Sequence, residues 1–205
     1  MAHHPRALWA EAVPNGDDHG PRRLTAEELF ALGDQSRGYE LVEGVLVRMS
    51  PTGGVHGRVA LKLAAALERW ADDHAAGDVL AAETGFWVSQ PGEADTVLAP
   101  DVAFVRAARV PARGSAEEAR YWRLSPDLVA EVASPSEFHP QMDSKAKAWL
   151  AAGVRAVWVV WPVAQTVVIW TPGSDTPIRT LASDETLADP DVLPGFTFPI
   201  SRLFA

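Results

Sequence analysis

Between residues 55 and 75, apolar side chains recur every three or four positions, which is the spacing of the buried face of an amphipathic α-helix. That face consists of Val59, Leu63, Leu67, Trp70 and Ala71. Similar spacing predicts shorter helices over residues 24–32 and 141–152. A capping-box pattern at the start of the first helix and Gly153 after the second support these limits.

Strand-like segments separate these helices. Residues 39–51, "YELVEGVLVRMSP", predict two short strands joined by a turn, and residues 155–170 predict a hairpin of two apolar strands. The segments "DVAFV", from residue 101, and "LVAEV", from residue 128, are apolar enough to lie inside a sheet. Residues 106–125 are polar, lack periodicity and predict a surface loop. This order of elements predicts a mixed α/β domain with a central sheet.

Composition and charge narrow the function. The absence of cysteine excludes disulfide bonds, thiolate zinc sites and cysteine nucleophiles. Eighteen basic and 27 acidic residues give a net charge of −9, whereas proteins that bind nucleic acid non-specifically are usually basic. Any contact with nucleic acid therefore needs a local basic patch, or metal ions that neutralise the site.

The chain is expected to fold as one domain. Its 205 residues are enough for a single domain with a substantial core. Residues 1–22 predict a flexible tail that lacks the apolar core of a signal peptide, and residues 23–205 predict the folded domain. Since no apolar run approaches the roughly 18 residues needed to cross a bilayer, we expect a cytoplasmic protein without membrane contacts.

Two acidic residues, Asp101 and Glu131, stand in the segments that predict interior strands. Burying a bare carboxylate is costly, and two such acids on neighbouring strands would repel each other unless a cation lay between them. Carboxylate oxygens suit Mg²⁺ or Mn²⁺. The alternative is a salt bridge from these acids to an arginine of the loop over residues 106–125.

Other charged residues have two interpretations each. Glu40 in a predicted strand and Glu43 at a predicted turn are either solvent-facing acids or parts of a site. Lys145 and Lys147 flank the apolar face of helix 141–152, and the periodicity slightly favours Lys145 over a solvated lysine. The loop arginines are either contacts for a nucleic-acid backbone or solvated residues balanced by nearby acids. They are Arg106, Arg109, Arg113, Arg120 and Arg123.

Several pieces of the sequence together resemble the Uma2 family of restriction-endonuclease-like proteins, within the PD-(D/E)XK nuclease superfamily. In chain order they are "YELVEGVLVRMSP", His56, "APDVAFV", "PDLVAEVASPS", "KAKAWLAAGV" and "VWVVWP". The resemblance implies a restriction-endonuclease-like core, with a mixed sheet flanked by helices and Mg²⁺, or Mn²⁺ in its place, at one edge. It further implies a DNA endonuclease that hydrolyses phosphodiester bonds.

The same resemblance assigns roles to individual residues. Asp101 and Glu131 match the metal-binding acids, and the backbone carbonyl of Val132 would complete the metal shell. The superfamily's lysine usually follows the second acid by two positions, where this chain has Ala133. Lys145 on the next helix takes the place of that catalytic lysine.

Auxiliary positions and departures complete the resemblance. Glu40 matches an acid that serves as an auxiliary ligand or orients water in catalysis, and Glu43 and His56 match further auxiliary positions. Trp161 stands where the family often has aspartate, and Trp149 where it often has tyrosine.

Two further expectations follow. The change at Trp161 and the net charge of −9 favour an alternative function, a catalytically inactive nuclease-fold module that binds nucleic acid or protein. Superfamily members often dimerise, and the tryptophan-rich hairpin over residues 155–170 offers an edge for a homodimer.

Overall fold

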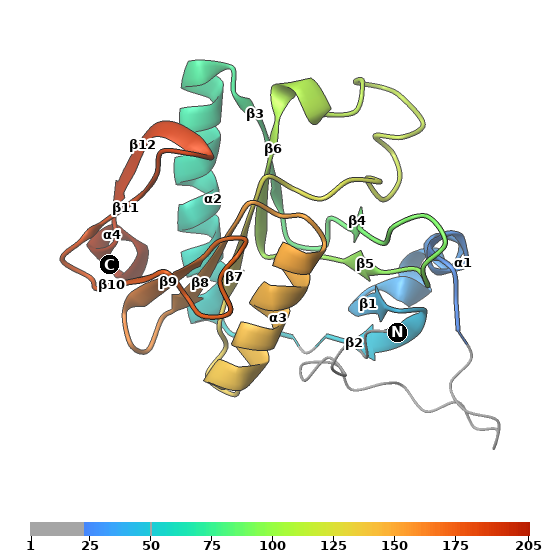
Figure 1. Cartoon of the computed structure of the whole chain (residues 1–205), viewed down its shortest axis with the longest axis horizontal. Coiled ribbons are helices and arrows are strands. Elements are labelled where there is room, and N and C mark those ends of the chain that lie inside the picture. The colour runs from blue at the N-terminus through green and yellow to red at the C-terminus, as the bar shows by residue number, and fades with distance from the viewer. Residues whose placement is uncertain (1–22, 50) are drawn as a thin grey trace.

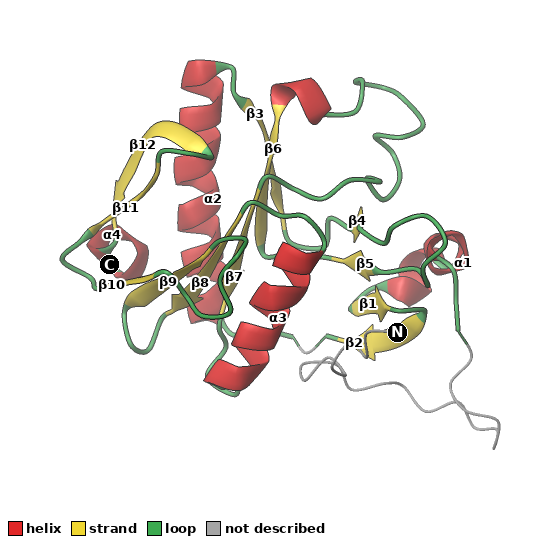
Figure 2. Cartoon of the chain, in the orientation of Figure 1, coloured by secondary structure: helices red, strands yellow, loops and turns green. Residues whose placement is uncertain are grey.

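Two helices lie on opposite faces of a six-stranded mixed sheet in the computed structural model, which describes residues 23–49 and 51–205 (Figures 1 and 2). The strands are β3 (Gly77–Ala81), β6 (Val102–Arg106), β7 (Leu128–Val132), β8 (Ala156–Trp161), β9 (Thr166–Trp170) and β10 (Arg179–Leu181). Their order is β10-β9-β8-β7-β6-β3, in which β7 and β8 run parallel and all other neighbours antiparallel. The predicted mixed α/β class is confirmed, whereas the predicted tail over residues 1–22 lies outside the described residues.

Each face of the sheet has its own apolar core. Helix α2 (Gly54–His74) buries the predicted stripe around Leu63 against one face, together with Phe104 of β6. Helix α3 (His139–Ala151) buries Met142 and its apolar neighbours against the other face. Because successive residues of a strand point to opposite faces, the sheet residues divide between these two cores according to their register.

A smaller antiparallel sheet with the order β2-β1-β5-β4 lies beside the first (Figure 1). Its strands are β1 (Tyr39–Val42), β2 (Val45–Arg48), β4 (Phe86–Trp87) and β5 (Val97–Leu98), and helix α1 (Ala26–Ala31) packs against it. The predicted capping box of α1 is confirmed, because Thr25 and Glu28 exchange hydrogen bonds. The chain passes from β5 to β6 through Pro100, whose missing N–H interrupts the strand ladder, and leaves Asp101 in a bend.

The C-terminal residues extend the main sheet by one strand and add to the core on its α2 face. They form β10, β11 (Thr186–Asp189), β12 (Leu193–Pro199) and the short helix α4 (Ser201–Phe204). Because β10 pairs with β9, the tryptophan-rich hairpin is not a free edge, and the prediction that it offers one for a dimer contact is wrong. A homodimer itself stays a prediction.

The outer surface and the remaining segments complete the fold. Single 3₁₀ turns occur at Gly33–Ser36 and Ala107–Arg109, so the loop predicted after β6 has little regular structure.

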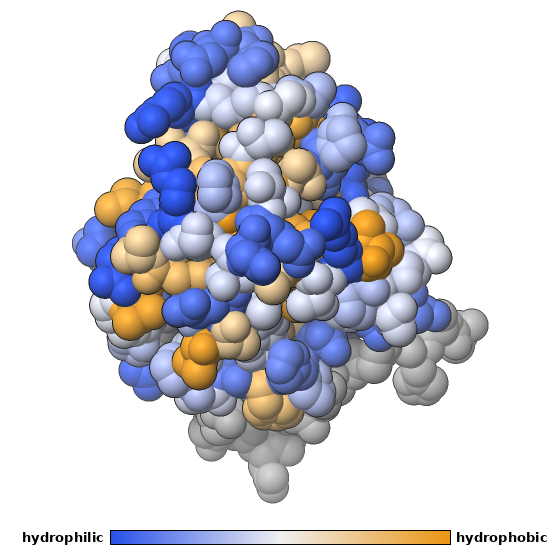
Figure 3. Space-filling view, turned by 90° about the vertical axis from the view of Figure 1, so that its left-hand side faces the viewer, coloured by the Kyte–Doolittle hydropathy of each residue, from blue (hydrophilic) through white to orange (hydrophobic). Residues whose placement is uncertain are grey.

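On the face that lies at the left of Figure 1, apolar residues are scattered among hydrophilic ones (Figure 3). No helix within the described residues combines the length and apolarity needed to cross a membrane.

Candidate active site

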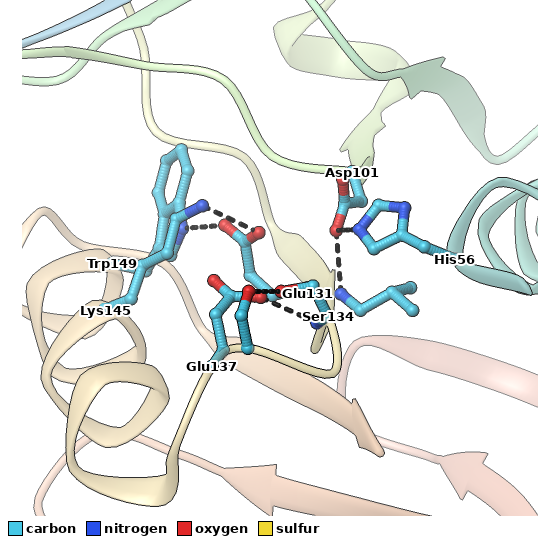
Figure 4. Close-up of polar contacts among 9 residues, drawn as sticks. His56, Asp101, Glu131, Ser134, Glu137, Lys145 and Trp149 are labelled. Carbon is cyan, nitrogen blue, oxygen red and sulfur yellow. Dashed lines mark hydrogen bonds and ion pairs between the residues drawn. The ribbon is translucent and has the colours of Figure 1, made fainter. Parts of the chain in front are cut away.

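Glu131 is the buried acid at the centre of the site, with only 2% of its surface exposed. Strand alternation places it on the α3 side of β7, where two side chains of α3 meet it (Figure 4). The Lys145 Nζ donates to its Oε2 at 2.9 Å, and the Trp149 Nε1–H donates to its Oε1 at 2.7 Å. Lys145 and Trp149 are four residues apart and therefore share one face of the helix. This pairing accounts for a charge inside the sheet.

Trp149 provides a test of how Glu131 is held. Replacing Trp149 with phenylalanine removes the N–H donor and leaves a buried carboxylate oxygen without that partner, so we expect a loss of about 1–3 kcal/mol in unfolding free energy. Trp158 is the matched control, because it is also fully buried but its Nε1 has no hydrogen-bond partner among the described residues. Urea unfolding of both variants measures the difference. Equal losses for the two would mean that the hydrogen bond to Glu131 contributes nothing beyond packing.

Asp101 lies beside Glu131 because its side chain binds the next residue of β7. Its Oδ2 accepts the Val132 N–H at 2.7 Å and lies 3.0 Å from the Nε2 of His56, in the first turn of α2 (Figure 4). Burial opposes the charged form of His56, but the hydrogen bond to Asp101 and the charges of Asp101, Glu137 and Glu131 outweigh it and raise the pKa of His56. His56 therefore fixes the orientation of Asp101.

Glu40 approaches the same site from the smaller sheet. Its Oε1 accepts the Ala99 N–H at 2.9 Å, whereas its buried Oε2 has no hydrogen-bond partner among the described residues. Burial raises the pKa of Glu40, the ammonium of Lys145 lowers it, and the charge of Asp101 raises it. Glu40 is thus close enough to Lys145 and Asp101 to interact with both through charge.

The cluster has more negative than positive groups. Burial raises the pKa of Glu131 to about 8, although the Lys145 ammonium opposes the shift. Burial also opposes the charge of Lys145, but the carboxylates of Glu131, Glu40 and Asp101 outweigh it and raise the pKa of Lys145. One ammonium and the imidazole of His56 therefore face three acids, and a further cation would stabilise the charged forms of these acids.

The donor atoms fit a small hard cation. In an extended strand, the N–H and C=O of one residue point to the same side, so the Val132 carbonyl faces the side on which its N–H meets Asp101. Mg²⁺ is commonly bound by one or two carboxylates and keeps several waters. Within residues 23–49 and 51–205, no group of three or more histidine and acidic side chains forms a metal cage. The Oε2 of Glu40, which has no hydrogen-bond partner among the described residues, is available as a further oxygen ligand for a metal ion. These residues therefore suit an ion that is held by few protein ligands.

The other residues singled out from the sequence lie elsewhere. Glu43 is exposed in the turn between β1 and β2, with a left-handed φ of 50°. The loop arginines already have partners. Arg106 and Arg109 pair with Asp127, Arg113 pairs with Asp78 and Glu118, and Arg120 and Arg123 lie over the rings of Phe30 and Trp87. The alternative salt bridges from loop arginines to Asp101 or Glu131 are therefore not formed.

Sequence reasoning missed the roles of two residues, one in the acid cluster and one at the opposite end of β7. The resemblance marks Trp149 only as a position where the family often has tyrosine, although its spacing of four residues from Lys145 indicates the same helix face. Asp127, just before β7, is 1% exposed and accepts the Arg106 N–H at 3.0 Å. Its position next to an apolar strand and after an arginine-rich loop was the available signal.

Comparison with known proteins gives a consistent result. The model of the Uma2 family, described as "Putative restriction endonuclease", matches residues 26–201. The crystal structure of a putative nuclease belonging to DUF820, from Anabaena variabilis, is similar with a TM-score of 0.74 and 19% sequence identity. The match covers 88% of this chain and 97% of that chain, which shows a shared fold. No curated protein matches the sequence.

Proposed function

Because the chain belongs to the Uma2 family of putative restriction endonucleases, we propose that it is a Mg²⁺-dependent DNA endonuclease. The observation that carries the proposal is the acid pair at one end of the sheet, in which Glu131 is buried and Asp101 is half-buried. Asp101 binds the N–H of Val132, directly after Glu131, and Lys145 pairs with Glu131. The pKa values of Glu131 and Glu40 are raised by burial, and buried acids with shifted pKa values around one lysine are typical of functional sites.

Asp101, Glu131 and the Val132 carbonyl would hold the ion, and Glu40 would serve as an auxiliary ligand or orient the attacking water. When bound, Mg²⁺ supplies charge that polarises the scissile phosphate and acidifies a coordinated water. A carboxylate has about four lone-pair sites. Glu131 can therefore bind an ion while it accepts hydrogen bonds from Lys145 and from the indole of Trp149.

Lys145 has an electrostatic role in this proposal. Because neighbouring carboxylates raise its pKa, its ammonium keeps the proton and is unsuited to act as a general base. Its fixed positive charge stabilises the negative charge that develops on the phosphate during attack. His56 and Trp149 act one step further away, by holding the carboxylates of Asp101 and Glu131 in position.

A cleavage assay tests the proposal. We expect the protein to nick or linearise plasmid DNA when Mg²⁺ or Mn²⁺ is present and to lose this activity when a chelator is added, because the acids cannot acidify water without the ion. Gel electrophoresis of plasmid and labelled oligonucleotides measures the products. Cleavage that continues unchanged in the chelator would overturn the metal-dependent mechanism.

The alternative, an inactive module, predicts a different result. Calorimetric titration with Mn²⁺ should give one site in an active nuclease, whereas the absence of binding at millimolar metal together with the absence of cleavage would favour the module. Trp161, where the family often has aspartate, is the residue that motivates this comparison.

A further inference from the structure

The strand ends place a half-buried tryptophan next to the candidate active site. Strands β7 and β8 are parallel, and Val132 is in register with Val160, so Trp161 lies one residue beyond Val132 at the same end of the sheet. Glu131 is in register with Val159, and alternation therefore puts Trp161 on the same face as Glu131. The indole of Trp161 stands at the border of the acid cluster.

Two exposed rings stand at the start of α3, and one of them contacts this tryptophan. The imidazole of His139 stacks on Trp161, with ring centroids 4.0 Å apart and an angle of 30° between the planes. Phe138, the preceding residue, is 54% exposed. It directly follows Glu137, whose carboxylate is close enough to raise the pKa of His56. We name Phe138, His139 and Trp161 the aromatic rim.

Phe138 has no evident structural reason to be aromatic. It is the N-cap residue of α3, with an extended backbone at φ −122° and ψ 158°. Ser, Thr, Asp and Asn are preferred there because their oxygens accept free N–H groups of the first turn, and a phenyl ring has no such oxygen. Its exposure means that burial does not compensate. A residue that is unfavourable for the local backbone structure and gains no stability from burial is typical of a functional position.

The arginines of the loop after β6 are not free to bind a duplex backbone. The net charge is −9, and the arginines of the loop after β6 are occupied by acids or aromatic rings. Backbone binding through counterion release needs free basic groups. Stacking of bases on aromatic side chains needs none, and removal of one such side chain changes affinity by about 5- to 150-fold.

We propose that the aromatic rim stacks an unpaired base of the substrate, so that the preferred substrate is single-stranded DNA or DNA with a locally single-stranded segment. The choice of DNA rests on the endonuclease function proposed above. Phe138 and the His139–Trp161 stack would hold the base while the neighbouring phosphate reaches Asp101 and Glu131.

The test is F138S, which replaces the ring with a residue preferred at an N-cap. We expect this variant to fold and to unfold at a temperature about 2–4 °C higher. Its affinity for a labelled single-stranded oligonucleotide should fall by about 5- to 150-fold, whereas its affinity for the duplex of the same sequence should stay unchanged. Fluorescence anisotropy in a Ca²⁺ buffer, with gels to monitor integrity, measures both.

I178S is the matched control, because Ile178 is 56% exposed and lies away from the site. Its N–H donates to the carbonyl of Ile169. Ile169 is in register with Trp158, in the middle of β8, and not with Trp161 at the end of β8 that borders the site. This variant should bind both DNAs like the wild type. Unchanged single-strand affinity in F138S, an equal loss for duplex, or no single-strand binding by the wild type would each overturn the proposal.

Cleavage assays separate this inference from the proposed function. If F138S cuts single-stranded and plasmid DNA at the wild-type rate, the stacking role is wrong and the endonuclease remains. If single-strand binding depends on Phe138 but the wild type cuts nothing with Mg²⁺ or Mn²⁺, the stacking role stands and the endonuclease is wrong.

Discussion

Replacing Lys145 with alanine is expected to destabilise the protein by about 3–5 kcal/mol at about pH 9, because the buried carboxylate of Glu131 loses its ion-pair partner. The Lys145 Nζ lies 2.9 Å from the Glu131 Oε2, and the two residues are 5% and 2% exposed. The site cannot compensate with solvent, and the remaining acids add repulsion. Urea unfolding with a spectroscopic readout measures the free energy of unfolding of both proteins.

This destabilisation should depend on pH. Burial raises the pKa of Glu131 to about 8, above its ordinary value of 4.5. A carboxyl with a raised folded-state pKa binds its proton more tightly when folded, so the stability that it contributes is present at low pH and lost as the pH rises. Removing the ammonium raises this pKa further. The difference between wild type and variant should therefore be small at about pH 6 and grow above about pH 8.

A double variant distinguishes lost charge balance from lost packing. Combining K145M with E131Q removes both charges and keeps an oxygen that can accept the Trp149 N–H. Replacing both members of a buried pair is often neutral, so this protein should recover most of the stability lost by K145A while it remains inactive. A double variant as unstable as K145A at every pH would contradict the ion-pair explanation.

The sequence located the acids because their burial conflicts with their neighbours. Both stand in apolar segments of the sequence, and strand alternation fixes the face on which Glu131 lies. The prediction that Asp101 lies inside a strand is wrong, because the chain forms a bend there after Pro100 and β6 begins only at Val102. The helical pattern alone left Lys145 and Lys147 nearly equivalent, since both flank the apolar stripe. The structure distinguishes the two lysines through β7. Its Glu131 faces Lys145 and makes burial of the Lys145 ammonium favourable.

The partners of the arginines were beyond local reasoning. The sequence offers several acids near the loop after β6, and only the fold brings Asp127, at the start of β7, under Arg106 and Arg109. Glu40 is a similar case, because its hydrogen bond from the Ala99 N–H joins two residues that are 59 positions apart in the sequence. Pairings over such distances depend on the packing of whole sheets, and a one-dimensional pattern carries little information about them.

Replacing Asp101 with asparagine is expected to reduce metal-dependent cleavage by about 10²–10⁴-fold, because a metal ion contributes several kcal/mol to charge stabilisation in the transition state. Asparagine keeps the size of the side chain and an oxygen that can accept the Val132 N–H. The change therefore removes the charge that would hold the ion and preserves the bond between the bend and β7. Initial rates of plasmid cleavage over a range of Mg²⁺ concentrations measure the effect, and Mn²⁺ calorimetry measures metal binding.

D127N is the matched control for this charge removal. Asp127 is also an acid that accepts a backbone N–H, but it lies at the opposite end of β7 and binds arginines instead of facing the acid cluster. Its replacement should lower stability through the arginine contacts and leave the cleavage rate of the folded protein within about threefold of the wild type. Asp127 is four residues from Glu131 along β7, roughly 13 Å at about 3.3 Å per residue, and its charge is already paired with arginines. A D101N protein that retains most of its rate at saturating metal would remove Asp101 from the site. A folded D127N protein that loses as much activity as D101N would show that the loss reflects general charge balance along β7 and not metal binding at its active end.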